Sequence, residues 1–233
     1  MSYTNITMID WRYKCTPIRD QGSCGSCTAF GAIGAIEALL RIKYETEKDL
    51  SERDLFACSG GRCSDGNTVE ATLNRAMSGI ATEDKCPYVP KDSTCMNYDR
   101  SAGAKITGYG CVIGTKDIKQ ALGSGPVVGT MAVHESFLHY RLGVYHSLGQ
   151  QDPIIGYHCI TIVGYDDALG AWLIRNSWGT GWGMQGYAYV KYGNSNIDQR
   201  GYIVTVNIPP PTPIPKSKCL GIGLLRKIFR RFL

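Results

Sequence analysis

The first half of the chain has the hydrophobic spacing of helices. From Ser26 to about Lys43, apolar residues recur every three or four positions, with glycines and alanines between them. This spacing gathers the apolar side chains on a buried helical face, where the small residues permit close contacts. Ser51 and Asp54 have the spacing of a helix-capping motif, so a short helix is expected to begin there. A third helix is predicted over residues 69–77.

From residue 105 onward, short apolar and β-branched runs separated by turn residues predict strands. The predicted strands cover residues 105–113, 126–133, 157–165, 171–176, 186–192 and 201–208. A short helix is expected around 116–122 and a further turn at 137–140. Residues 1–23 are predicted to be an extended lead-in with turns, and 80–103 to be irregular. Helices first and strands afterwards indicate an α+β protein whose two lobes meet at a cleft.

A run of prolines after the last predicted strand divides the chain. Residues 1–208 are predicted to be the folded body, with a helical lobe over about 10–104 and a β-rich lobe over about 105–208. The proline-rich run 209–215 is expected to be a stiff, extended spacer. Residues 216–233 form an appended tail.

Basic charge is concentrated in this tail. The whole chain has a net charge of +5, but the tail carries six basic residues and no acid, so the rest has a net charge of −1. A near-neutral body gives no sign of a nucleic-acid surface. Within the tail, apolar pairs alternate with basic pairs; the apolar ones are Leu224–Leu225, Ile228–Phe229 and Phe232–Leu233.

A helix with this pattern has one apolar stripe and one basic face, which predicts binding to an anionic membrane surface. The apolar run is too short to span a bilayer. Three alternatives stay open for the tail: it lacks a fixed structure, it docks on the body, or it reaches the cleft and restrains activity.

The cysteine content indicates a compartment. Ten cysteines are many for an intracellular chain of 233 residues, and they predict an oxidising setting, whether secreted, lysosome-like or virion-associated. No signal peptide is evident at the N-terminus, and no run of about 18 apolar residues predicts a transmembrane helix.

The segment Gln21-Gly22-Ser23-Cys24-Gly25-Ser26-Cys27 runs directly into the first predicted helix. Cys27 would lie at the helix N-terminus, where the positive end of the helix dipole favours the reactive thiolate. The spacing of Cys24 and Cys27 is also that of a redox pair or of half a zinc site. No second Cys or His pair with zinc-site spacing is evident, and the long lead-in lacks the βαβ context of a redox motif.

Two further motifs lie in the strand-rich half. His158 begins an apolar strand, where a histidine on its own is more often structural than catalytic. Asn176 lies in a run of tryptophans and glycines, Trp172 to Gly183, that is not a generic core pattern. The Asn176 side chain can accept a ring N–H of His158, and Trp178 can shield that hydrogen bond from water.

These three motifs, in this order, resemble the papain-like cysteine peptidases, which include the cathepsins. The resemblance runs from Asp10 to the end of the last predicted strand. It implies a papain-like two-lobed fold, with a helix-rich N-terminal lobe, a β-barrel-like C-terminal lobe and the active site in the cleft between them.

The resemblance also implies roles. Cys27 corresponds to the nucleophile, His158 to the general base and acid, and Asn176 to the residue that orients the histidine. Gln21 and the backbone N–H of Cys27 correspond to the oxyanion-hole donors. The implied protein is a monomeric endopeptidase that acts on peptides or proteins and needs neither a metal nor an organic cofactor.

Substrate contacts follow from the same resemblance. The substrate-binding residues that it implies are Asp65, Gly66, Asn67, Thr68, Gly156, Tyr157 and Trp178. The backbone of Gly66 would pair with an extended substrate. Because no strongly charged residue is evident among those lining the main pocket, an apolar preference is expected there.

The implied disulfides join Cys24 to Cys63 and Cys58 to Cys95. The cysteines left without a partner are Cys15, Cys86, Cys111, Cys159 and Cys219, of which Cys159 is expected to be a small buried residue. The chain departs from the family at Thr28, where an aromatic residue is usual, and at Arg200, near the place of a third disulfide.

Two competing functions stay open, a catalytically silent binding homologue and a Cys-His acyltransferase of transglutaminase type. The intact set of Cys27, His158, Asn176 and Gln21 argues against the first, and the asparagine with its neighbouring tryptophans argues against the second. The remaining histidines, His134, His139 and His146, are expected in loops or on the surface.

Overall fold

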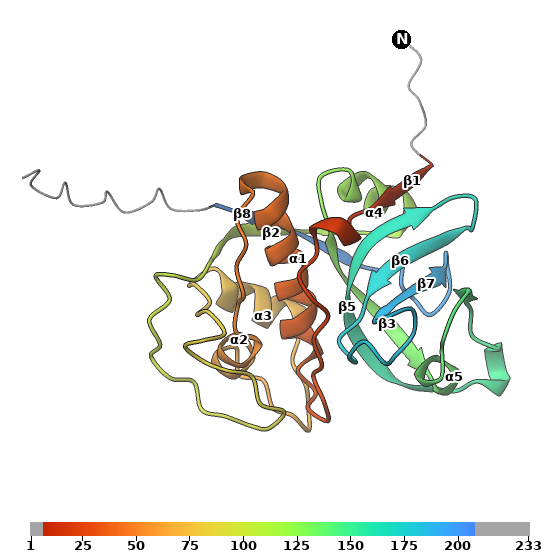
Figure 1. The fold of residues 1–233 in the computed structure, drawn as a ribbon. Helices are drawn as coiled ribbons and strands as arrows, with labels where there is room; N and C mark the ends of the chain where they lie inside the picture. The colour runs from red at the N-terminus through yellow and green to blue at the C-terminus, as the bar shows by residue number, and fades with distance from the viewer. Residues whose placement is uncertain (1–6, 208–233) are drawn as a thin grey trace, which may run out of the picture.

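A long helix passes through the middle of the molecule (Figure 1). In the computed structural model, which describes residues 7–207, this helix is α1 (Cys27–Tyr44), and every residue from Thr28 to Leu40 is buried. The predicted periodicity is confirmed, and small residues explain the close packing. A Cβ on Gly31 would lie only 2.7 Å from the sulfur of Cys159. Glycine therefore lets α1 lie directly against the strand that carries His158.

Two shorter helices complete the helical lobe, α2 (Glu52–Cys58) and α3 (Val69–Ala76). Each begins at a side-chain cap, and the cap of α2 is the predicted one. The hydroxyl of Ser51 accepts the N–H of Asp54 at 3.0 Å, and the hydroxyl of Thr68 accepts the N–H of Ala71 at 3.1 Å. Residues 80–103 contain no regular helix or strand, as predicted.

Both predicted disulfides are confirmed in this lobe. Cys24 is bonded to Cys63 and Cys58 to Cys95. Each closes a loop of nearly forty residues, since the sequence separations are 39 and 37, and each is worth roughly 2–4 kcal/mol of stability. Such bonds persist in an oxidising environment.

The described residues form an eight-stranded sheet in which every pairing is antiparallel except that of β4 with β7. Seven strands lie in the order β2-β8-β3-β5-β6-β7-β4, and β1 pairs with β5. The strands are β1 (Met8–Asp10), β2 (Ile106–Val112), β3 (Val127–His134), β4 (Val144–Tyr145), β5 (Ile154–Asp166), β6 (Ala171–Arg175), β7 (Tyr187–Lys191) and β8 (Gly201–Val206). The short helices of this lobe are α4 (Gly114–Leu122) and α5 (Glu135–Leu138).

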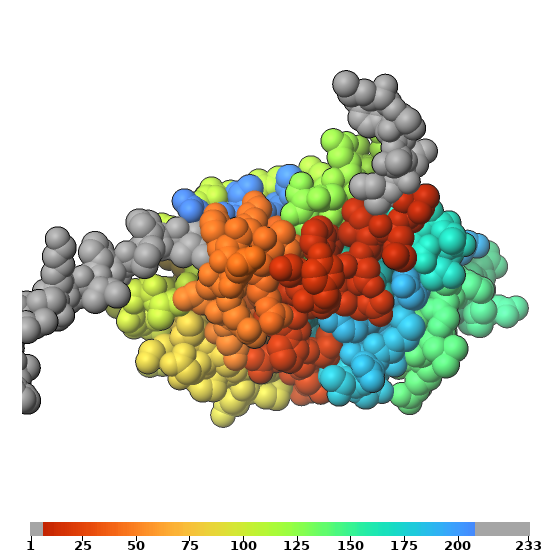
Figure 2. All heavy atoms as spheres, turned by 45° about the horizontal axis from the view of Figure 1, so that its top comes forward, coloured from red at the N-terminus to blue at the C-terminus, as the bar shows by residue number. Residues whose placement is uncertain are grey.

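The six predicted strands are confirmed to within three residues at each end, but β1 and β4 were not predicted. Both are three residues long or fewer, too short to show a period of two. The lead-in, predicted to be extended with turns, thus contains a short strand. After β1 it passes through the 3-10 turn Arg12–Lys14 and lies on the surface between α1 and the strands, as Figure 2 shows in red.

The two larger of three hydrophobic clusters among the described residues support the two lobes. One joins α1, α2 and α3, and it also takes in Val204 and Val206 of β8. The other fills the β-rich lobe, between the sheet and helices α4 and α5. Strand β5 lies between them, because its residue Cys159 packs in the first core and its neighbour Ile160 in the second. The side chain before them, His158, is thus held where the lobes meet. This arrangement is a two-lobed α+β fold, as predicted.

Within residues 7–207, none of the helices has both the length and the apolar content needed to cross a bilayer. The predicted proline-rich spacer and basic tail lie outside the described residues.

Candidate active site

Cys27 is the first residue of α1, and its loop is fixed from several sides. The neighbouring Cys24 is bonded to Cys63, and the N–H of Gly25 donates to the carbonyl of Cys63 at 3.0 Å. Because the sulfur of Cys24 is already in a disulfide, it is neither the redox partner of Cys27 nor a zinc ligand. Within residues 7–207 no cluster of three or more His, Cys, Asp or Glu side chains could hold a metal ion.

The electrostatics of Cys27 reflect two opposed causes. Burial raises the pKa of its thiol above the ordinary value, whereas the backbone N–H groups of Cys159, Thr28 and Cys27 itself lower that pKa. The N–H groups of Cys27 and Thr28 belong to the N-terminus of α1, which has no helical carbonyl partner for them. The site therefore holds donors that stabilise a thiolate once it forms.

His158, near the start of β5, is paired with Asn176, the residue after β6. The Nε2 atom of His158 lies 2.8 Å from Oδ1 of Asn176, and that oxygen also accepts the N–H of Ser177 at 2.8 Å. The carbonyl oxygen of an amide can only accept, so Nε2 must carry a hydrogen and donate it. In the neutral imidazole Nδ1 is then the unprotonated nitrogen, available as a base.

The side chain of His158 is buried and lies against an aromatic ring. The ring of Trp178 lies 4.8 Å from that of His158, and Trp178 packs in turn against Phe137 and Trp182 at 5.7 and 5.2 Å. Burial lowers the pKa of His158 to about 4, although the hydrogen bond with Asn176 acts in the opposite direction. The shielding predicted for Trp178 agrees with this geometry. Phe137, which supports Trp178, lies in no sequence motif.

Gln21 is held by both ends of its side-chain amide. Its Oε1 accepts the hydroxyl of Ser177 at 2.6 Å, and its Nε2 donates to the carbonyl of Cys24 at 2.9 Å. A primary amide nitrogen carries two hydrogens, so one N–H of Nε2 is left for a further acceptor. The buried amide is thus pre-organised as a donor beside the Cys27 loop. Ser177, which sequence reasoning missed, follows directly after Asn176.

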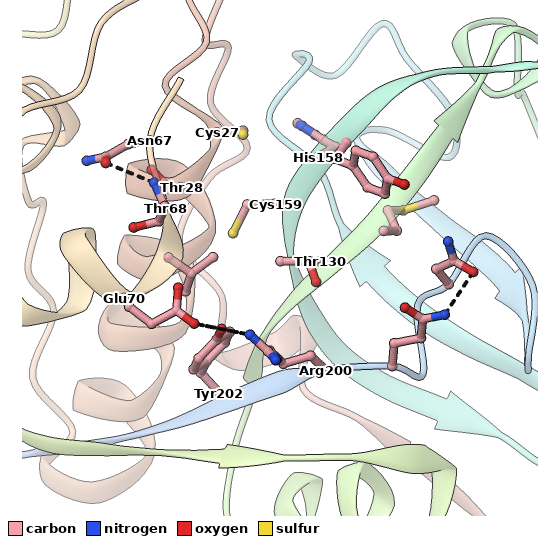
Figure 3. Close-up of a pocket in the computed structure, with 15 residues that line it drawn as sticks. Cys27, Thr28, Asn67, Thr68, Glu70, Thr130, His158, Cys159, Arg200 and Tyr202 are labelled. Atoms are coloured by element: carbon pink, nitrogen blue, oxygen red, sulfur yellow. Dashed lines mark hydrogen bonds and ion pairs between the residues drawn. The ribbon is translucent and has the colours of Figure 1, made fainter. Parts of the chain in front are cut away.

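Cys27 and His158 both line a pocket of about 410 Å³, a volume typical of ligand sites. Figure 3 shows Cys27 and Thr28 on the helical side of this pocket, and His158 and Thr130 on the side of the strands. The hydroxyl of Thr28, which replaces the usual aromatic residue, accepts a hydrogen bond from Thr72 at 2.9 Å.

The predicted substrate residues divide into two groups. Asn67, Thr68 and Tyr157 line the pocket as predicted. The residues predicted to bind substrate that do not line it are Asp65, Gly66, Gly156 and Trp178.

The backbone of Gly66, which was predicted to pair with substrate, bonds to that of Arg62. The N–H of Gly66 donates to the carbonyl of Arg62 at 2.7 Å, and its own carbonyl accepts the N–H of Arg62 at 3.2 Å. A carbonyl oxygen has a second lone pair. Of the two groups expected to pair with substrate, only the Gly66 carbonyl keeps that capacity.

The pocket also has charged lining residues that the sequence analysis did not identify. Glu70 and Arg200 both line it, together with Tyr202. Glu70 comes from the first turn of α3, and Arg200 immediately precedes β8. They are 130 positions apart and belong to different lobes, so no local sequence motif predicts that they pair.

The expectation that His134 lies in a loop or on the surface was wrong. His134 ends β3 and is buried, and its Nδ1 lies 2.6 Å from the carbonyl oxygen of Asp152. This contact joins the end of β3 to Asp152, which indicates a structural role. His139 and His146 are exposed, as predicted.

Most of the described cysteines outside the two disulfides are buried. Among residues 7–207 the free thiols are Cys15, Cys27, Cys86, Cys111 and Cys159. Cys159 is buried, as expected, and also lines the pocket beside Cys27. Cys219 lies outside the described residues.

Comparison with known proteins finds matches along most of the chain. A family model described as papain family cysteine protease matches residues 6–205. Digestive cysteine proteinase 1 of Homarus americanus is 38% identical over 204 residues, which cover 82% of this chain and 63% of that protein. Cathepsin K of Gallus gallus is 39% identical over 193 residues, 77% of this chain and 57% of that protein. The chain thus spans less than two thirds of the length of these curated relatives.

Solved structures agree with the sequence matches. The bromelain protease of Ananas comosus, in complex with the E64 inhibitor, superposes with a TM-score of 0.75 at 28% identity. That superposition covers 86% of this chain and 99% of the bromelain chain.

Proposed function

The chain belongs to the papain family of cysteine proteases, and from this premise we propose that it is a cysteine endopeptidase that cleaves peptide bonds through a thioester. One observation supports this activity above the others. A thiol at the start of a buried helix shares one pocket with a histidine whose tautomer is set by an asparagine. Nucleophile, base and orienting residue are the parts that acyl transfer requires.

The reaction would proceed in two steps. Cys27 gives its proton to Nδ1 of His158 and attacks the scissile carbonyl, and the resulting oxyanion accepts hydrogen bonds from Nε2 of Gln21 and the N–H of Cys27. His158 then returns the proton to the leaving amine, which departs and leaves the thioester. In the second step His158 takes a proton from water and the hydroxide attacks the thioester. The carbon–sulfur bond then breaks, the acid product leaves, and His158 returns its proton to the sulfur of Cys27.

The two charges of the catalytic pair must form together. Burial opposes a thiolate and an imidazolium taken singly, raising the pKa of Cys27 and lowering that of His158. Transfer of one proton between them creates opposite charges side by side, and their attraction offsets this cost. The helix N–H groups near Cys27 and the oxygen of Asn176 near His158 favour the same charge-separated state.

The pH dependence of kcat/KM follows from this pair. The working form holds one proton between Cys27 and His158, wherever that proton resides. Acid adds a second proton and removes the base, so activity is expected to be lost as pH falls through about 4, the pKa of His158. At high pH the remaining proton is lost. Because the pKa of Cys27 is raised, activity is expected to fall only at a pH above the ordinary thiol pKa. Initial rates measured from pH 3 to 10.5 test this prediction. A loss of activity at the ordinary pKa of histidine, as the pH is lowered, would contradict it.

A peptide library distinguishes endopeptidase from exopeptidase action. Mass spectrometry of products from peptides blocked at both ends is expected to show internal cleavage. Cleavage confined to the terminal one or two residues of unblocked peptides would contradict the proposal. Incorporation of an added primary amine in place of water would indicate acyl transfer instead.

We further propose that the protein acts as a monomer in an oxidising compartment and that its tail binds anionic membrane. The two disulfides support the compartment, and the alternating apolar and basic pairs of residues 216–233 support the membrane contact.

The membrane contact predicts a salt-sensitive binding that depends on the tail. The full chain is expected to co-sediment with vesicles containing phosphatidylserine at low salt, and a variant ending at Pro209 is expected to stay in the supernatant, because basic residues are attracted to anionic lipid. Neutral phosphatidylcholine vesicles are the control. Equal binding by the two forms, or binding by neither, would contradict the membrane role.

A further inference from the structure

The pocket beside Cys27 contains an ion pair that joins the two lobes. Nη1 of Arg200 lies 3.3 Å from Oε1 of Glu70, and the hydroxyl of Tyr202 donates to the same oxygen. All three residues line the pocket, and Figure 3 shows the pair beyond Thr28 and Thr130, away from Cys27 and His158. A substrate side chain that fills the pocket would therefore meet both a carboxylate and a guanidinium.

Both groups are charged at neutral pH. The hydrogen bond from Tyr202 lowers the pKa of Glu70. Partial burial opposes this effect, but the N–H of Glu70 at the start of α3 and the neighbouring Arg200 also lower that pKa. Burial raises the pKa of Tyr202 to about 12, so its hydroxyl keeps the hydrogen that it donates. The pocket thus has one anion and one cation, with no net charge from the pair.

Each partner keeps hydrogen-bonding capacity that the pair does not use. Among the hydrogen bonds of residues 7–207, Oε2 of Glu70 accepts none and Nε and Nη2 of Arg200 donate none. The side chains of Arg200 and Glu70 are 53% and 44% exposed, so a ligand can reach these atoms. An unused acceptor and unused donors therefore lie together at this part of the pocket.

We propose that Glu70 and Arg200 determine specificity, and that the pocket selects a substrate side chain with a carboxamide end, glutamine or asparagine. The inference rests on the proposed peptidase function. A carboxamide can donate to Oε2 of Glu70 through its nitrogen and accept from Arg200 through its oxygen. Its methylene stem can pack on the buried Val69 and Met131 of the same pocket.

Other side chains fit less well for physical reasons. A lysine would be attracted to Glu70 but repelled by Arg200, and a glutamate would experience the reverse. A leucine would take water from both groups without replacing their hydrogen bonds, which costs free energy. Discrimination against a side chain that lacks the matching polar groups reaches about 10⁴-fold in fully buried sites. Because these groups are half exposed, about a 5- to 20-fold preference is expected here.

Four peptides that differ only in the residue bound by this pocket test the inference. The wild type is expected to cleave the glutamine peptide about 5- to 20-fold more efficiently, as kcat/KM, than the leucine, lysine and glutamate peptides. Arg200→Met leaves Glu70 unpaired, so the lysine peptide is expected to become the best substrate. Glu70→Gln leaves Arg200 unpaired, so the glutamate peptide is expected to become the best. These two shifts have opposite signs, which a general structural disturbance would not produce.

Control measurements separate this inference from the proposed function. Arg12→Met removes an exposed ion pair with Asp10 outside the pocket and is expected to leave the preference unchanged. The rate at which iodoacetamide alkylates Cys27, together with Tm, reports whether each variant keeps its site and fold. A wild-type preference for leucine, or variants that leave the order unchanged, would overturn the inference alone. A wild type that cleaves none of the four peptides would overturn both.

Discussion

Replacement of Cys27 by alanine is expected to lower kcat for peptide hydrolysis by about 10⁴-fold or more. The sulfur forms the bond to the acyl group, and no neighbouring side chain can take its place. Cys159 lines the same pocket, but burial raises the pKa of its thiol well above the ordinary value, so it stays protonated. Steady-state rates on one peptide, compared with the wild type, measure the loss.

The control for this variant is Cys111→Ala. Cys111 is a free, exposed thiol on β2, outside the pocket, so its removal is expected to leave kcat unchanged. Both variants are expected to keep the wild-type circular dichroism, because alanine is tolerated at the first position of a helix and the side chain of Cys111 is exposed. A Cys27→Ala protein that retains a tenth of the wild-type rate would show that the nucleophile has been wrongly identified.

The sequence could predict those parts of the molecule whose signal is local. The helix over α1 and six of the strands follow from hydrophobic spacing within single segments. The positions of Cys27, His158 and Asn176 follow from three short motifs, each with an unusual composition. Strands β1 and β4 could not be predicted, because two or three residues show no periodicity.

Other parts depend on contacts between distant segments. The hydrogen bond that holds the amide oxygen of Gln21 comes from Ser177, which is 156 positions away. The ion pair in the pocket requires β8 to lie beside β3, with Tyr202 opposite Val128, so that Arg200 comes within reach of α3. No spacing in the sequence reports such a pairing. The apolar preference expected from Asn67, Thr68, Gly156 and Tyr157 was argued without the two charged residues that also line the pocket.

Small residues connect the fold to the chemistry. Gly31 and Gly34 of α1 lie one and nearly two turns after Cys27, and a Cβ on either would come within 2.7 Å of a side-chain atom of β5. Larger residues there would force β5 away from the helix. Because His158 is the residue directly before Cys159 on β5, the distance between base and nucleophile depends on these glycines. The same helix thus supplies the core of one lobe and the spacing of the site.

Replacement of Gln21 by alanine is expected to lower kcat about 100- to 1000-fold and to leave KM within a few-fold of the wild type. Loss of one oxyanion-hole donor has an effect of this size, because the hydrogen bond matters most when the oxyanion develops. The rate of Cys27 alkylation by iodoacetamide is expected to stay the same, since displacement at that carbon forms no oxyanion.

A second variant separates donation by Gln21 from the structural effect of removing its side chain. Ser177→Ala removes the hydroxyl that donates to Oε1 of Gln21 at 2.6 Å, but leaves Nε2 in the protein. The amide keeps its bond to the carbonyl of Cys24, so a smaller loss, about 3- to 30-fold, is expected than the full effect of a missing donor. If Gln21→Ala slows alkylation as much as hydrolysis, the residue positions Cys27 and is not an oxyanion donor. If Ser177→Ala matches Gln21→Ala in full, the orientation of the amide, set by Ser177, accounts for the whole effect.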